Sequence, residues 1–569
     1  MRESQARDLA NTQLLCLRPL TVLDFSHGGR SLDWNSVSQA RRRLEKEQGT
    51  IFKDWGGRIP IALIYPNTYR IGMSNLGLHV IYRLLNDSPH VVCERVFYHR
   101  NDRHAISLES QRALRDFAVL AFSLSFEMDY FNVIALLRQG GIPLSSQERD
   151  ERLPLLIGGG PCVTANPEPL APVFDAFVIG EGEPVLPRLT ETLRQNINAD
   201  REELLRRLAA IPGIYVPHLY DVKRHDERVV EIRPPSGVPC PVERQWVSNL
   251  DAYPASSAIL TEDTEFGDMY LLEVTRGCAR RCRFCLAGAT YLPARERSLD
   301  ILLALGRRGL KWRPRLGLIG ASLSDYSHIE ELATGLRDMG AAISVASLRV
   351  DPLPEPLLQA LAESHVQTLT VAPEAGSQRL RRKIGKGIST DQIMHAAELA
   401  SRHNFPHLKL YFMLGLPTET DQDAEQIVDL LRAIRKTFTR RLTVNVTPFV
   451  PKAQTPFQRS AMAPLEVLER RLHYVKRHLG SMNIAVRSDS GRWAQVQAVL
   501  ARGDRRVGEA LMSIPNNNLS SWRKALGRAG LEMQPLLASR SEDEILPWAT
   551  VSSGMSRAAP GCDVAQEAM

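Results

Sequence analysis

Six short apolar runs follow one another between residues 270 and 447, and stretches with helical periodicity separate them. The runs are Tyr270–Thr275, Leu316–Gly320, Ala342–Ala346, Thr368–Ala372, Leu408–Met413 and Leu442–Thr447. This alternation leaves no space for long antiparallel excursions, so it predicts parallel strands joined by crossover helices. We therefore predict a six-unit partial (β/α) barrel over residues 266–460, with its functional site at the C-terminal ends of the strands.

Three cysteines follow the first of these runs directly, with the spacing Cys278-x3-Cys282-x2-Cys285. Three thiolates can hold three irons of a [4Fe–4S] cluster, and the fourth iron then keeps an open coordination position. A structural zinc site fits less well because no fourth Cys or His lies nearby. The other five cysteines are scattered, which argues against a disulfide framework and suits a reducing compartment.

The region from 51 to 200 has a similar alternation of apolar runs and helical stretches, which predicts a doubly wound parallel sheet. The expected strands are Ile59–Tyr65, Phe117–Ser123, Leu153–Ile157 and Ala176–Ile179. In such sheets the C-terminal strand ends form one rim, where Ser123, Gly158–Gly160 and Gly180–Gly182 should lie. Glycines there would let a backbone approach a large ligand, although plain tight turns explain them equally well.

The remaining segments carry less information. We expect an N-terminal extension over 1–50, a linker with a small hairpin over 201–265, and a small α+β domain with a tail over 461–569. The chain is thus predicted to be an α/β protein of several domains, as its 569 residues also suggest.

Composition and charge exclude some classes. No apolar run approaches the length of a membrane helix, and the N-terminus lacks the apolar core of a signal peptide. We therefore expect a cytoplasmic protein without a membrane partner. The net charge of +7 is mild, and much of it is arginine spread over amphipathic helices. A nucleic-acid partner is compatible with this charge, but no motif supports one.

The cysteine spacing, with Phe284 before the third cysteine, resembles the radical S-adenosylmethionine (radical SAM) superfamily. The resemblance continues through residues 317–325, 347–351, 372–377 and 411–420. It implies a [4Fe–4S] cluster held by Cys278, Cys282 and Cys285, which would also be the catalytic residues. It further implies S-adenosylmethionine bound near Phe284, Ser322, Arg349, Glu374 and Gly415. The glutamate of a frequent Gly-Gly-Glu stretch is absent here, so its contact would pass to Ser322 or to backbone carbonyls.

The N-terminal region resembles the cobalamin-binding domain that precedes the barrel in one branch of that superfamily. Ser123-Leu-Ser125 and Gly158-Gly-Gly160 stand where the branch has its Ser-x-Leu and Gly-Gly motifs, which implies Ser123, Gly158 and Gly159 as cobalamin contacts. The usual Asp-x-His-x-x-Gly motif is missing from the loop at 66–72. Either cobalamin binds without a protein histidine, or the domain has kept the fold without the cofactor. Residues 50–550 look like a bacterial subfamily with this architecture.

The resemblance implies an enzyme that reductively cleaves S-adenosylmethionine, with cobalamin-dependent methyl transfer to an unactivated carbon of an unknown substrate. It also implies a flavodoxin-like or ferredoxin-like reductant protein as partner. One alternative is a cobalamin-independent oxidation, rearrangement or sulfur insertion. Another alternative is a non-catalytic iron–sulfur protein that binds RNA or ribosomes.

Overall fold

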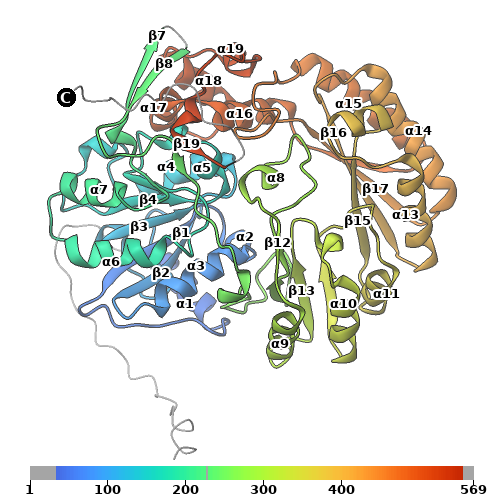
Figure 1. Cartoon of the computed structure of the whole chain (residues 1–569), viewed down its shortest axis with the longest axis horizontal. Coiled ribbons are helices and arrows are strands. Elements are labelled where there is room, and N and C mark those ends of the chain that lie inside the picture. Colours follow the sequence, from blue (N-terminus) through green and yellow to red (C-terminus); the bar gives the residue numbers. More distant parts are fainter. Residues whose placement is uncertain (1–33, 226–227, 555–569) are drawn as a thin grey trace, which may run out of the picture.

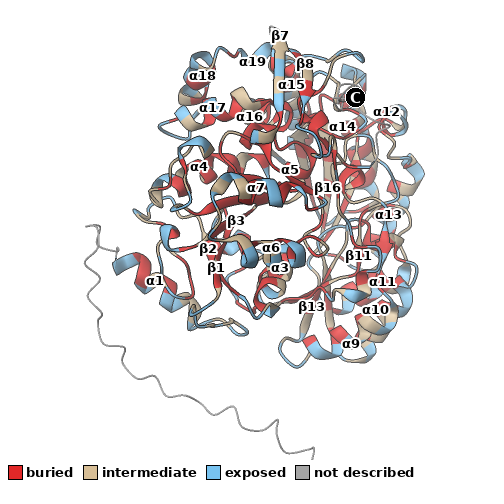
Figure 2. Ribbon diagram, turned by 60° about the vertical axis from the view of Figure 1, so that its left-hand side comes forward, coloured by how far each residue is buried: buried red, intermediate tan, exposed pale blue. Residues whose placement is uncertain are grey.

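The computed structural model describes residues 34–225 and 228–554 of the chain (Figure 1). Of the expected N-terminal extension, residues 1–33 lie outside this part, and its described portion begins with helix α1 (Trp34–Leu44). Much of the predicted C-terminal tail also lies outside the described residues. Figure 2 shows the buried residues concentrated in the strands and in the helix faces that cover them.

The N-terminal part is built on a six-stranded sheet of order β2-β1-β3-β4-β5-β6. Its strands are β1 (Ile59–Tyr65), β2 (Val91–Phe97), β3 (Val119–Ser123), β4 (Leu155–Gly159), β5 (Ala176–Val178) and β6 (Ile214–Tyr215). All neighbours are parallel except β5 and β6. The predicted parallel sheet is therefore confirmed. It also contains two strands, β2 and β6, that the apolar runs did not reveal.

Helices cover both faces of this sheet (Figure 1). They are α2 (Tyr69–Gly72), α3 (Leu76–Asp87), α4 (Tyr130–Gln139), α5 (Pro161–Ala165), α6 (Leu186–Asn196) and α7 (Arg201–Ala209). Alternate residues of β1 enter two different cores: Ile61 and Leu63 pack with α3 and α6, whereas Ala62 and Ile64 pack with α4 and α5. A strand buried on both faces is apolar throughout, which is why a continuous apolar run revealed it.

The connecting region contains a hairpin of β7 (Asp221–His225) and β8 (Arg228–Arg233). Further along, β9 (Val242–Glu243) pairs in parallel with β19 (Val551–Ser552), close to the end of the described chain. The connecting region is thus tied to the C-terminal segment by backbone hydrogen bonds.

The six strands expected between 270 and 447 all form, and they run parallel to their neighbours. A three-stranded sheet holds β10 (Tyr270–Glu273), β13 (Arg315–Ile319) and β14 (Ala342–Val345). A four-stranded sheet holds β15 (Thr368–Glu374), β16 (His407–Leu414), β17 (Arg441–Pro448) and β18 (Ala485–Ser488). A parallel bridge between Leu348 and Val371 connects them. The strands are thus grouped into two hydrogen-bonded sheets rather than one.

Crossover helices follow these strands as predicted. They are α9 (Leu299–Gly309), α10 (Ile329–Asp338), α11 (Glu355–Glu363), α13 (Thr390–Arg402) and α14 (Asp421–Thr437). Two of them begin with a capping box, in which Ser389 and Thr420 each exchange hydrogen bonds with the residue three positions on.

The C-terminal helices return to the N-terminal part. They are α15 (Leu465–Gly480), α16 (Gly491–Arg502), α17 (Arg505–Ser513), α18 (Leu519–Arg528) and α19 (Met533–Leu537). The Phe131 ring of α4 lies 6.3 Å from the Trp493 ring and 5.6 Å from the Trp522 ring. Figure 1 shows these helices spanning the top of the molecule, from the N-terminal sheet to β16. In the described ranges, no helix is both long and apolar enough to cross a membrane.

Candidate functional site

The cysteine loop, residues 277–286, connects β11 (Thr275–Arg276) with α8 (Ala287–Thr290). It begins at Gly277, whose φ of +82° is a conformation that favours glycine. A Cβ atom at Gly277 would lie 2.2 Å from the carbonyl oxygen of Tyr291, so a side chain cannot fit there. The three thiols of the loop are free and partly exposed. The turn into the loop is therefore fixed by the backbone, and it presents three available thiols.

A second loop holds the cysteine loop from the other side. The backbone N–H of Arg283 donates to the carbonyl of Ile384 at 2.9 Å. The Phe284 side chain packs against an apolar cluster that includes Ile384 and Phe457. The Arg283 guanidinium also lies 5.2 Å from the Phe457 ring centroid. Phe284, expected at the S-adenosylmethionine site, is thus found anchoring the loop.

The surroundings of the thiols act in two directions on their ionisation. Burial raises the pKa of Cys282, whereas the nearby charges of Lys386 and Arg349 lower it. Burial also raises the pKa of Cys285, and the backbone N–H groups of Gly288 and Ala287 oppose this effect. Cations and N–H donors stabilise the thiolate, which is the form that binds metals. The donor set therefore fits an iron–sulfur cluster.

No three His, Cys, Asp or Glu side chains in the described part of the chain are grouped as ligands of one metal ion. A [4Fe–4S] cluster makes a different demand, because each cysteine binds its own iron. Three thiols spread along one loop meet that demand.

Glu374 and Arg349 both lie beside the cysteine loop, as the sequence predicted. The Glu374 carboxylate lies 3.1 Å from the Lys386 ammonium. The charges of Glu374, Lys386 and Arg349 all influence the pKa of Cys282. Glu374 adopts a φ of +71°, a left-handed conformation that is strained for a residue with a side chain. Burial raises the pKa of Glu374, and the Lys386 and Arg349 charges oppose the rise. Strained, partly buried carboxylates of this kind are typical of functional sites.

Ser322 reaches the same region through Asp325, a residue that the sequence reasoning did not select. The Ser322 hydroxyl donates to the Asp325 carboxylate. The same carboxylate pairs with Arg280 of the cysteine loop at 2.5 Å and lies 3.8 Å from Arg349. The signal that could have revealed Asp325 was its place at the end of the polar turn after β13, opposite an arginine-rich loop. A hollow of about 780 Å³ opens beside Arg280 and Asp325.

Gly415, also expected near S-adenosylmethionine, is explained by packing. Its φ is +84°, and a Cβ atom there would lie 2.6 Å from Cδ2 of Leu468 on α15. Its N–H donates to Glu419 at 2.6 Å, and that carboxylate pairs with Arg471. A contact with S-adenosylmethionine stays a prediction at this position.

The expected cobalamin contacts lie at the rim of the N-terminal sheet. Ser123 is the parallel register partner of Gly159. A Cβ atom added at Gly159 would make only an ordinary contact, 3.8 Å from the Cβ atom of Val178. Gly158 is different, because a Cβ atom there would meet the Phe177 ring at 2.8 Å. Packing therefore requires a glycine at position 158 but not at position 159. The loop at 66–72 supplies no imidazole for cobalt.

A buried ion cluster connects this rim with the start of the cysteine loop. Arg276 pairs with Glu181 at 2.9 Å, with Glu183 at 2.8 Å and with Glu273 at 2.9 Å. Glu181 also pairs with Arg295 at 2.6 Å. Burial disfavours the charged form of Arg276, but the three carboxylates raise its pKa above the ordinary value. The sequence pattern predicted a rim at the glycines on either side of Glu181 but gave no sign of the carboxylate between them.

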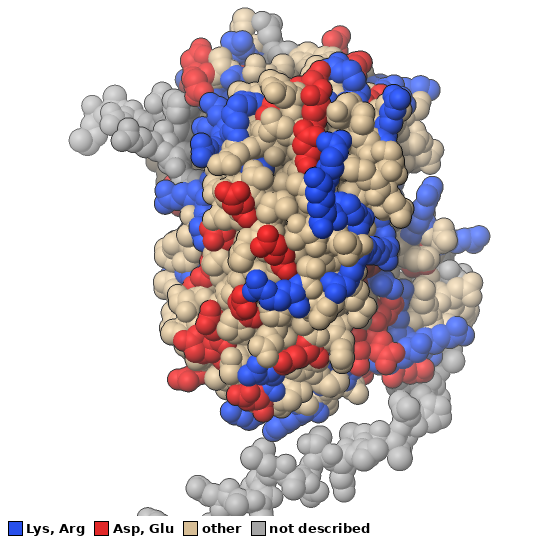
Figure 3. All heavy atoms as spheres, turned by 90° about the vertical axis from the view of Figure 1, so that its right-hand side faces the viewer, with Lys and Arg blue, Asp and Glu red and all other residues tan. Residues whose placement is uncertain are grey.

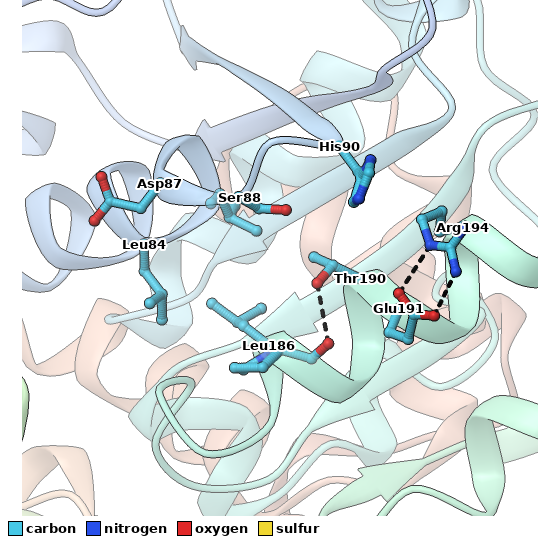
Figure 4. A pocket seen from close by; sticks show the side chains of 10 residues that line it. Leu84, Asp87, Ser88, His90, Leu186, Thr190, Glu191 and Arg194 are labelled. Carbon is cyan, nitrogen blue, oxygen red and sulfur yellow. Dashed lines mark hydrogen bonds and ion pairs between the residues drawn. The ribbon is translucent and has the colours of Figure 1, made fainter.

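Two surface features lie apart from this site. Figure 4 shows a pocket between α3 and α6, where Glu191 and Arg194 pair with each other. Figure 3 shows the face on the right of Figure 1, where lysine and arginine are interspersed with aspartate and glutamate. That face therefore carries both signs of charge rather than a single basic field.

Comparison with known proteins gives these features a family. Residues 272–431 match the model described as "Radical SAM superfamily", and residues 77–217 match "Radical SAM proteins, N-terminal". The first match includes the cysteine loop. The chain belongs to the radical SAM superfamily. It is accordingly a radical SAM enzyme, and membership implies a [4Fe–4S] cluster and S-adenosylmethionine. The non-catalytic alternative is thereby disfavoured.

This radical SAM chain is similar to two further proteins in sequence and to one solved structure in fold. "Uncharacterized protein MJ0966" of Methanocaldococcus jannaschii is 32% identical over 468 residues, 82% of this chain and 94% of that protein. "Uncharacterized methyltransferase PH0819" of Pyrococcus horikoshii is 25% identical over 49% of this chain and 58% of that protein. The radical S-adenosylmethionine methyltransferase TsrM from Kitasatospora setae, solved with cobalamin and a [4Fe–4S] cluster, matches with a TM-score of 0.51. That match covers 83% of this chain and 99% of TsrM at 14% identity, so it shows a shared fold.

Proposed function

We propose that this radical SAM enzyme uses Cys278, Cys282 and Cys285 to hold its cluster and cleaves S-adenosylmethionine at the mouth of a partial barrel. The observation that carries the proposal is the convergence on one loop of three free thiols, the Glu374–Lys386 pair and the Arg349–Asp325 pair. The elements come from the ends of parallel strands, where barrel sites are built.

A bound cluster would supply the electron for reductive cleavage of a carbon–sulfur bond of S-adenosylmethionine. The chain's own residues hold the reactants. Lys386 and Arg349 place positive charge beside the thiolates and beside Glu374. The Glu374 carboxylate would accept hydrogen bonds from the amine of the methionine part of S-adenosylmethionine. Arg349 would pair with the carboxylate of the same methionine part. Ser322 and Asp325 fix the position of Arg280 and thereby of the loop.

We further propose that the enzyme transfers a methyl group to an unactivated carbon of its substrate, with cobalamin at the rim formed by Ser123 and Gly159. The paired register of these two residues supports the proposal, as do the fold shared with TsrM and the methyltransferase name of PH0819. Cobalamin would be the carrier of the methyl group. Since loop 66–72 has no histidine, the chain would bind cobalamin without an imidazole ligand.

A cobalamin-independent radical reaction is the second candidate, and the missing histidine favours it. In that case the N-terminal domain would serve as a structural support for the cysteine loop, through Glu181 and Arg276. A flavodoxin-like or ferredoxin-like reductant and a cytoplasmic location complete the proposal.

One preparation tests both candidates: the full chain, purified without air from cells supplied with cobalamin. Iron–sulfur absorbance, together with formation of 5′-deoxyadenosine or S-adenosylhomocysteine, is expected. Cys282→Ala should abolish the cluster and both products. Cys93→Ala, which removes a buried thiol of β2, should keep both. An unaffected Cys282→Ala variant would overturn the cluster assignment, and protein that retains no cobalamin would favour the second candidate.

A further inference from the structure

The four-stranded sheet has one face that helices do not cover. In β16 the residues Leu408, Leu410, Phe412 and Leu414 are buried, and they belong to the same core as α13 and α14. The alternate residues His407, Lys409, Tyr411 and Met413 are only partly buried. Successive side chains of a strand point to opposite faces, so these four lie on the face turned away from α13 and α14. We call it the inner face; in Figure 1 it is the side of β15–β17 opposite those helices.

The strand register places several polar side chains together on the inner face. Tyr411, Asn445 and Arg487 are direct partners across β16, β17 and β18. Lys409 lies one step toward the N-terminal ends, with its ammonium 4.8 Å from the Tyr411 ring centroid. Because in-register partners of a parallel sheet point to the same side, Arg487 shares this face with Lys409.

Three cations of β16, β17 and β18 on the inner face have no carboxylate partner within the described residues. Lys409, Arg441 and Arg487 form no ion pair within the described residues. Burial lowers the pKa of His407, and the charges that lower it further are those of Arg441, Lys409 and Arg487. Both nitrogens of the His407 ring are engaged by hydroxyls, of Thr368 at 3.0 Å and Thr443 at 2.8 Å. Three cations therefore act on one hydrogen-bonded imidazole and disfavour its protonation.

We propose that Lys409, Arg441 and Arg487 bind a phosphate group of the substrate on the inner face of the sheet. Three cations exceed the single charge of a carboxylate and match a phosphate dianion, which arginine can engage with two parallel hydrogen bonds. This deepens the proposed function, on which it rests, by naming a substrate class.

The strand geometry also sets the size of that substrate. Glu374, beside the cysteine loop, follows a register shift in β15 and is paired with Phe412, three residues beyond Lys409. Three residues of a strand span about 10 Å. A substrate whose phosphate is held at Lys409 would therefore present a carbon about 10 Å away to the proposed cofactor site. Phosphorylated metabolites of that length form the expected class.

The test measures binding of inorganic phosphate to the full, cluster-loaded chain by calorimetry at constant ionic strength, with acetate in a separate arm. Phosphate should bind, and acetate should bind at least tenfold more weakly. Lys409→Met and Arg487→Met should each weaken phosphate binding at least tenfold, whereas Lys409→Arg should retain it. Lys436→Met, an exposed lysine in the last turn of α14, is the matched control and should bind as the wild type does.

Three results would overturn the proposal: no phosphate binding by the wild type, equal binding by Arg487→Met, or equal affinity for acetate. Arg487 is exposed on the edge strand β18, so its substitution should leave the fold intact. Iron content and S-adenosylmethionine cleavage are measured on the same samples. A failure of the proposed function would appear in those two readouts, and a failure of the phosphate site would appear in calorimetry alone.

Discussion

Arg276 and Glu181 lie 2.9 Å apart, although 95 residues separate them in the sequence. Glu181 stands on the turn after the last parallel strand of the N-terminal sheet, and Arg276 is the second residue before Cys278. Both side chains are almost fully buried. The pair therefore fixes the start of the cysteine loop against the rim of the N-terminal domain.

Glu181→Gln should destabilise the protein strongly. It removes one carboxylate from a buried cluster and leaves Arg276 and Arg295 short of a partner, and breaking a buried pair costs about 3 kcal/mol or more. The measurement is the denaturant midpoint of the full chain. Glu191→Gln breaks an exposed pair with Arg194 on α6 and serves as the control, with little change expected. Similar midpoints for the two variants would contradict the prediction.

Glu374→Gln should weaken binding of S-adenosylmethionine about tenfold, which corresponds to about 1.4 kcal/mol. The variant keeps the shape of the side chain but removes the negative charge beside Lys386 and Cys282. Equilibrium binding to cluster-loaded protein is the measurement, with iron content as a check. Glu355→Gln, at the exposed start of α11, is the control. Unchanged affinity in Glu374→Gln would remove this residue from the cofactor site.

Asp325→Asn should increase the rate at which the protein loses the iron of its cluster. The Asp325 carboxylate pairs with Arg280 of the cysteine loop and with Arg349, and it accepts the Ser322 hydroxyl; an amide loses both charged contacts. We expect iron to be lost to a chelator several-fold faster than from the wild type. Asp338→Asn, on the exposed end of α10, provides the comparison. Equal rates would show that Asp325 does not support the loop.

Asp129 predicts a pH dependence of stability. Burial raises the pKa of Asp129 to about 6, the Asn67 amide opposes this, and Glu127 adds to it. The folded state therefore binds more protons than the unfolded state between about pH 4 and pH 6, so this group's contribution to stability falls as pH rises through that window. The raised pKa corresponds to a change in stability of at most about 3 kcal/mol across this window.

The checking experiment compares Asp129→Asn with the wild type by denaturant unfolding at pH 4.5 and pH 7. Other carboxylates contribute equally to both proteins, so the difference between the two curves isolates Asp129. The variant should gain stability relative to the wild type as the pH rises. An unchanged difference between the proteins at the two pH values would count against a raised pKa. Asp116→Asn, on the surface, is the control.

The sequence predicted the parallel strands well because their apolar runs are continuous. It missed β2, in which Glu94 and Arg95 interrupt the run and are nevertheless buried. Arg95 is neutralised there by Glu47 and Glu109, each at 2.7 Å, and no local pattern reveals partners so far along the chain. A buried ion pair can thus make a strand look like a surface loop.

The residues of the candidate site also fall into two groups, those that the sequence revealed and those that it did not. The three cysteines could be found from spacing alone, and Arg349 and Glu374 from their places after strands. Glu181 could not be found so, because its role depends on Arg276, far away in sequence, and the place of Asp325 after β13 gave no sign of its partner Arg280. Gly415 and Gly158 mark the opposite error, since packing against Leu468 and Phe177 requires a glycine whether or not a ligand is bound.

The hydrogen bond from Arg283 to Ile384 bears on how the protein is made. About one hundred residues lie between the two, so a chain still emerging from the ribosome displays its three cysteines well before the loop that clamps them exists. The Glu374–Lys386 pair also forms only after that point. Iron captured earlier would meet thiols held in no fixed arrangement. A cluster held in the arrangement described here therefore requires that residues 374–386 have been made and have folded against the cysteine loop.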